Sequence, residues 1–140
     1  MLKLFLGIVC VFLCLSCNST DNKTLAIKFS ADSSTIVVSN IEAAALFHLK
    51  NNIKTDTSYQ KLVSVLETPA EDDSVSMERE WPGTLDMQGD NAVFKPDSPF
   101  LKGKTYLVET QLNMSFADIE QMIKGKVRRT MNFKQQVLKR

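Results

Sequence analysis

The fold is decided by residues 83–96, which read GTLDMQGDNAVFKP. Residues 84–88 and residues 91–95 flank the dipeptide Gly89-Asp90. A glycine in the first position of a two-residue loop is typical of a type II′ hairpin turn. This turn pairs Leu85 with Phe94, and the other apolar pairs then fall on the same face. We therefore predict an antiparallel hairpin with one buried face.

Further strands are predicted on both sides of the hairpin, where apolar residues alternate or β-branched residues gather between turn residues. Seven to nine short strands at this spacing are typical of a β-sandwich or a barrel. The predicted strands, besides the two of the hairpin, cover residues 25–29, 35–38, 59–66, 75–81, 105–112 and 127–133.

Two segments have helical character. Residues 40–52 are ambiguous, because the apolar spacing fits a short helix while residues 46–49 could form a strand; we expect a short helix entering a strand. Ser115 can cap a second short helix at residues 116–124, which Gly125 would end. The sequence thus predicts an all-β domain with one or two short helices.

A longer block is more specific. Residues 83–96 are followed by Pro99-Phe100-Leu101-Lys102-Gly103-Lys104-Thr105-Tyr106, and the opening Ile27–Ser30 reads IKFS. This pattern resembles bacterial Ig-like domains, in which a first strand I-x-F-S and a hairpin ending in F-x-P precede P-L-x-x-G-x-x-Y. The resemblance implies an Ig-like antiparallel β-sandwich with Tyr106 as a tyrosine corner, whose hydroxyl ties back the preceding loop. Such domains are commonly spacers, adhesive modules or binding modules without shared catalytic residues.

The N-terminus has the pattern of an export signal. Lys3 precedes twelve apolar residues at positions 4–15, a run too short to span a membrane. Leu15-Ser16-Cys17 resembles the lipobox of bacterial lipoproteins, with Cys14 standing at −3, where Leu is usual. The resemblance implies that Cys17 is lipidated and becomes the mature N-terminus. Lipoproteins with such loose lipoboxes and polar tethers are frequent in the Bacteroidetes group.

This interpretation divides the chain into a signal peptide at residues 1–16, a tether at 17–23 and one folded domain at 24–140. Cys10 and Cys14 leave with the leader, so the domain holds no disulfide framework and no cysteine metal site. We expect a lipid-anchored protein of the cell envelope, on the outer membrane or the periplasmic side. An ordinary signal peptide or an uncleaved anchor is the alternative.

Four residues are candidates for binding. Trp81 could be an exposed indole that stacks on sugars, although a core or loop-anchoring role is the stronger alternative. Tyr106 belongs to the same region. Arg128 and Arg129 lie in residues 124–140, which hold seven bases and no acid, whereas residues 67–80 hold six acids. A basic tail of this kind can bind anionic envelope polymers or lipid headgroups, or it can be a solvated strand with a frayed end.

Other patterns are weak. Gly103-Lys104-Thr105 lacks the partner glycine and the following helix of a P-loop. Asp86, Gln88, Asp90 and Asp97 have some calcium-loop spacing but run through a predicted strand. His48 is the only histidine, and we expect it to be structural or half-exposed.

The formal charge is +1, so nothing favours a nucleic-acid partner. We expect a non-enzymatic envelope module without cofactor or metal that binds another protein or a surface polymer. The alternatives are a small periplasmic hydrolase or accessory factor, and a carrier of an apolar ligand.

Overall fold

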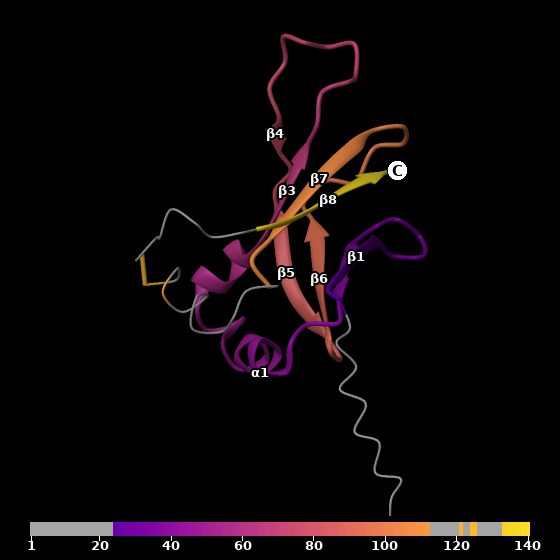
Figure 1. The fold of residues 1–140 in the computed structure, drawn as a ribbon. Helices are drawn as coiled ribbons and strands as arrows, with labels where there is room; N and C mark the ends of the chain where they lie inside the picture. The colour runs from indigo at the N-terminus through magenta and orange to yellow at the C-terminus, as the bar shows by residue number, and fades with distance from the viewer. Residues whose placement is uncertain (1–23, 113–120, 122–123, 126–132) are drawn as a thin grey trace, which may run out of the picture.

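The hairpin lies at one side of a sheet in a two-layer structure (Figure 1). The computed structural model describes residues 24–112, 121, 124–125 and 133–140. All strand pairings among these residues are antiparallel, and they form two four-stranded sheets. The strands of the first sheet follow one another in the order β1 (Ala26–Phe29), β2 (Ile36–Ser39), β6 (Asn91–Pro96) and β5 (Gly83–Gln88). Those of the second sheet follow in the order β4 (Arg79–Glu80), β3 (Val63–Glu67), β7 (Thr105–Thr110) and β8 (Lys134–Lys139).

This strand order is that of an Ig sandwich. In the Ig fold one sheet carries strands A, B, E and D and the other carries C, F and G. Labelling β1, β2 and β3 as A, B and C, and β5 to β8 as D to G, reproduces both sheets, with β4 added beside C. The prediction of an all-β, Ig-like antiparallel sandwich with one or two short helices is therefore confirmed.

The predicted hairpin register is also confirmed. Leu85 pairs with Phe94, and Gln88 pairs with Asn91 across the turn. Gly89 has φ +59°, as the first central residue of a type II′ turn requires, and no positive φ is found at Asp90.

The core lies between the two sheets, because every second residue of the central strands points inward. Ile36 and Val38 of the first sheet face Val65 and Val108 of the second, and all four are buried. Thr110 is the one buried polar residue among the described positions. Its hydroxyl donates to the Leu62 carbonyl at 2.9 Å and accepts from the Leu112 N–H at 3.1 Å, so its burial leaves no hydrogen bond unmade.

Two short helices connect the sheets between β2 and β3. Helix α1 (Ala43–Asn52) confirms the expected short helix, and it continues through residues 46–49, so the strand that it was expected to enter there is wrong. The 3₁₀ helix η1 (Thr57–Leu62) replaces the first half of the strand predicted at residues 59–66. Its two buried residues, Tyr59 and Leu62, are three positions apart, which is the period of a 3₁₀ turn rather than of a strand.

Helix η1 also closes an edge of the first sheet. The side-chain amide of Gln60 donates to the carbonyl of Leu85 at 3.0 Å and accepts from its N–H at 2.7 Å. Gln60 thus takes the place of a neighbouring strand along the outer edge of β5 and joins the helix to the sheet.

Two strand boundaries differ from the prediction. Of the strand predicted at residues 75–81, only Arg79–Glu80 forms, and the preceding residues belong to a loop. The strand β8 (Lys134–Lys139) follows the segment predicted as the last strand, residues 127–133, of which only Phe133 is described and is not in a strand. The predicted helix at 116–124 lies almost wholly outside the described residues. The predicted fraying of the C-terminus is wrong, because Arg140 donates its N–H to the carbonyl of Lys104 at 3.0 Å.

The sandwich has two chemically different ends (Figure 1). We call one the loop pole; it holds the β1–β2 turn, the β3–β4 loop, the β6–β7 connection and Arg140. We call the other the helix pole; it holds Thr24, α1 and the β5–β6 turn. Hydrogen bonds bring these segments together at each end: Gly103 donates to Arg140 at the loop pole, and Asn40 donates to Thr24 at the helix pole. None of the described helices is long and apolar enough to cross a membrane.

Candidate binding surface at the loop pole

The loop pole is built on a cluster of four aromatic residues: Phe29, Trp81, Phe100 and Tyr106. The ring centroids of Phe100 and Tyr106 are 4.8 Å apart, and those of Trp81 and Tyr106 are 5.4 Å apart, both in edge-to-face geometry. Such pairs stabilise a core beyond the burial of their area. The connections at this pole therefore rest on a rigid base.

Tyr106 forms the tyrosine corner that the resemblance implies. Its hydroxyl accepts a hydrogen bond from the N–H of Leu101 at 2.8 Å, five residues upstream, and so ties the β6–β7 connection to β7. Because its side chain is fully buried, Tyr106 supports the fold and presents no surface for a ligand. The prediction of a binding role for Tyr106 is corrected accordingly.

Trp81 anchors loops rather than a ligand. Only 7% of it is exposed, its indole N–H donates to the Ser98 carbonyl at 3.0 Å, and one face stacks near Phe100. The guanidinium of Arg79 lies 5.3 Å from the ring centroid, within cation–π range. The structure thus has no open indole face for sugar stacking, and the loop-anchoring alternative describes this residue.

Glu67 forms ion pairs with residues of β4 and of the β6–β7 connection, next to the aromatic cluster. One carboxylate oxygen lies 2.5 Å from the Arg79 guanidinium, and the other lies 3.6 Å from the Lys104 ammonium group. The Glu67 side chain is only 12% exposed, so these interactions are screened less than an ordinary surface ion pair. Glu67 therefore fixes the position of β4 and of the β6–β7 connection relative to β3.

The β3–β4 loop, residues 68–78, rises from this fixed base and projects beyond both sheets (Figure 1). Asp73 organises it by accepting hydrogen bonds from the N–H groups of Val75 and Ser76 at 3.1 and 2.9 Å. Hydrogen bonds from Ser76 and then from Val75 lower the pKa of Asp73 below its usual value. Beyond this turn, Val75 is 90% exposed and Met77 is 88% exposed.

Two open hollows lie beside the β3–β4 loop. One, of about 340 Å³, is lined by the loop together with Glu67, Arg79 and Lys104. The other, of about 430 Å³, lies between the first residues of the loop and Lys102, Lys104 and Lys139. The surface around the loop therefore combines two exposed apolar side chains with carboxylates and ammonium groups.

The other sequence candidates lie elsewhere. His48 is on α1 at the helix pole, half-exposed, with its ring 5.4 Å from that of Phe47. Asp86 and Asp90 are on the hairpin in ion pairs with Lys95 and Lys50, at 3.2 and 2.5 Å. Within the described part of the chain, no three His, Cys, Asp or Glu residues are grouped so that they could hold a metal ion.

Three predicted residues, Cys17, Arg128 and Arg129, lie outside the described residues. Sequence reasoning missed the exposure of Val75 and Met77, which it assigned to a strand. Their signal was present, because the two apolar residues stand alone within the most acidic segment of the chain, where a buried strand face would be crowded by carboxylates.

Comparisons of the chain with known protein families, with curated proteins and with solved structures find no match.

Proposed function

We propose that the chain is a lipid-anchored, non-enzymatic envelope module that binds another protein of the cell envelope through the β3–β4 loop. The observation that carries this proposal is the exposure of Val75 and Met77 at the end of a loop that is fixed at its base. Exposed apolar surface that is rimmed by polar residues marks interaction sites, and Val75 and Met77 are exposed two residues apart within a run of polar and charged residues.

The placement of the two poles supports the proposal. The carbonyl of Thr24 accepts a hydrogen bond from Asn40, just before α1, which places Thr24 at the helix pole. The β3–β4 loop lies at the opposite end of the sandwich (Figure 1). If Cys17 carries the lipid, the anchor attaches seven residues before Thr24. The loop would then face away from the membrane, where a partner can reach it.

A protein partner fits the loop better than a polysaccharide. Binding sites for sugars commonly use an open aromatic face, whereas Trp81 is only 7% exposed and its ring lies close to the Arg79 guanidinium and to the rings of Phe100 and Tyr106. Val75 and Met77 instead offer an aliphatic and a thioether side chain, which adapt to apolar pockets on a protein. The hydrolase and apolar-carrier alternatives stay predictions that no observation of the described residues favours.

Site-specific photo-crosslinking in intact cells tests the binding proposal. We expect a crosslinker at position 75 to yield a discrete protein adduct, and one at Asn51, an exposed position on α1, to yield none of the same mass. A Met77→Ser change in the chain that carries the position-75 crosslinker should weaken the adduct. Identical adducts at both positions, or no adduct at position 75, would contradict the proposal.

Metabolic labelling with a radioactive fatty acid tests the anchor. We expect label on the chain and on a Val75→Ser control, and none on Cys17→Ser, which should leave the membrane fraction. A Cys17→Ser chain that is still labelled and membrane-bound would show that this cysteine is not the anchor.

A further inference from the structure

We propose that α1 rests on the bilayer to which the chain is anchored, with the side chain of Phe47 inserted among the lipid headgroups. This inference rests on the proposed lipid anchor at Cys17. It adds a second membrane contact, and therefore a fixed orientation of the domain, to that anchor.

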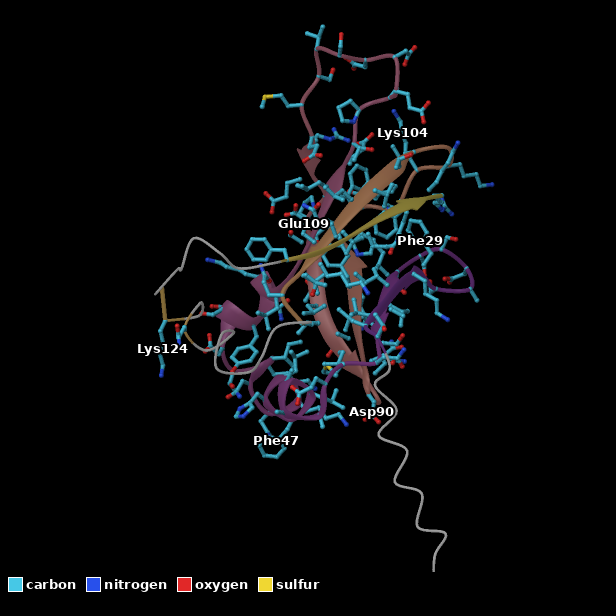
Figure 2. All side chains as sticks on the ribbon, viewed as in Figure 1. Phe29, Phe47, Asp90, Lys104, Glu109 and Lys124 are labelled. Atoms are coloured by element: carbon cyan, nitrogen blue, oxygen red, sulfur yellow. The ribbon has the colours of Figure 1, made fainter. Side chains whose placement is uncertain are left out.

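Phe47 is the exposed aromatic residue of α1. The helix buries Ala45 and Leu49 against the core, and Phe47, two residues from each, points the other way with 65% of its surface exposed. Figure 2 shows its ring directed away from the sheets at the end of the molecule that also carries Asp90. Ala44, one turn before Phe47, is exposed as well, so the outward face of α1 begins with apolar residues.

The length of the tether places this face near the membrane. Seven peptide units separate Cys17 from Thr24, and a fully extended chain of that length spans at most about 25 Å. The carbonyl of Thr24 accepts a hydrogen bond from Asn40 at 3.2 Å, and α1 begins three residues later at Ala43. The helix pole therefore stays within reach of any bilayer that holds Cys17.

The charges around Phe47 predict a contact that is apolar rather than electrostatic. Lys50, on the same face, is paired with Asp90 at 2.5 Å. Among the described residues that adjoin α1 in the chain, Glu42 and Lys54 are exposed, one charge of each sign. A near-neutral surface gains little from anionic lipids, whereas an aromatic residue on the outer face of a helix gains from leaving water at the membrane interface.

The test uses the lipidated full chain, purified from membranes and reconstituted in vesicles. A genetically encoded fluorescent amino acid is placed at Ala44, or at Val75 as a control on the opposite pole. Spin-labelled phospholipid then quenches whichever probe touches the bilayer. We expect quenching at position 44 and none at position 75, to the same extent in phosphatidylcholine vesicles and in vesicles with added phosphatidylglycerol.

Two variants at position 47 separate insertion from mere proximity. Phe47→Ser should reduce the quenching at position 44 to the level at position 75, and Phe47→Leu should retain most of it. Because Phe47 is mainly exposed, both variants should fold, which the emission of Trp81 in the buried core reports.

Each other outcome overturns the inference in a recognisable way. Quenching that is absent at position 44 in a fatty-acid-labelled protein refutes the membrane contact but leaves the anchor intact. Quenching that survives Phe47→Ser, or that requires phosphatidylglycerol, refutes the apolar insertion. Crosslinks between two copies through position 47 would show that a second chain covers α1. A chain without fatty-acid label refutes the anchor and the membrane contact together.

Discussion

Replacing Tyr106 by Phe removes one hydroxyl group from the tyrosine corner and little else. The ring keeps its contacts with Phe100 and Trp81, at centroid distances of 4.8 and 5.4 Å, because Phe has the same ring. What is lost is the acceptor for the Leu101 N–H at 2.8 Å. A partly buried donor left without a partner costs about 1–3 kcal/mol, a large share of the roughly 5–15 kcal/mol that stabilises an ordinary domain.

Urea unfolding followed by fluorescence measures this loss, since Trp81 is the only tryptophan of the chain and lies within the cluster. With a typical m-value of about 2 kcal/mol per molar urea, a loss of about 2 kcal/mol lowers the midpoint by about 1 M. Tyr106→Leu, which also removes the ring contacts, should cost more, about 3–5 kcal/mol. An unchanged midpoint in Tyr106→Phe, together with unchanged hydrogen exchange at the Leu101 amide, would refute the reasoning.

Three further predictions concern single residues. In Gly83→Ala the new Cβ would collide with the carbonyl oxygen of Lys95, so we expect a loss of about 1–3 kcal/mol in the same urea assay. Gln60→Met keeps the side-chain volume but removes both hydrogen bonds to the edge of β5; we expect about 1–3 kcal/mol, and faster hydrogen exchange in β5 than in β7. The exposed carboxyl of Asp32 should titrate by NMR with a pKa of about 2, because the Ser34 hydroxyl and other groups of its turn donate to it. Since this pKa is lower than that of the unfolded chain, the turn is favoured above about pH 4 and loses that contribution as the pH falls toward 2.

The hairpin was predictable because its signals are local and agree with one another. Gly89 supplies the positive φ of the turn, and the register that the turn sets places Leu85 opposite Phe94 and Met87 opposite Ala92. The corner at Tyr106 was expected from the resemblance to bacterial Ig-like domains, and the hydrogen bond from the Leu101 N–H to the Tyr106 hydroxyl agrees with it.

The strand predicted at residues 75–78 does not form, and the reason is a residue elsewhere in the chain. Continuing the register Glu67–Arg79 would place Met77 opposite Pro69. Proline has no N–H to donate, so the ladder ends there. On its other side β3 still pairs with β7 at this point, because Thr68 donates its N–H to the carbonyl of Thr105 at 3.0 Å. Alternation alone cannot reveal that a strand lacks a partner.

The sandwich fold does not require a β3–β4 loop of this length. Its base is already closed by the pairing of Glu67 with Arg79, and a two-residue turn would connect the same strands. Eleven residues instead of two raise the entropic cost of closing the loop by only about 1.5 kcal/mol, and the exposed side chains of Val75 and Met77 return none of it through burial in the core. The same holds for Phe47 at the opposite pole, which α1 does not need for packing. A protein contact at the loop pole would bury Val75 and Met77, and a membrane contact at the helix pole would bury Phe47; these are the three most exposed of the large apolar side chains that the structure describes.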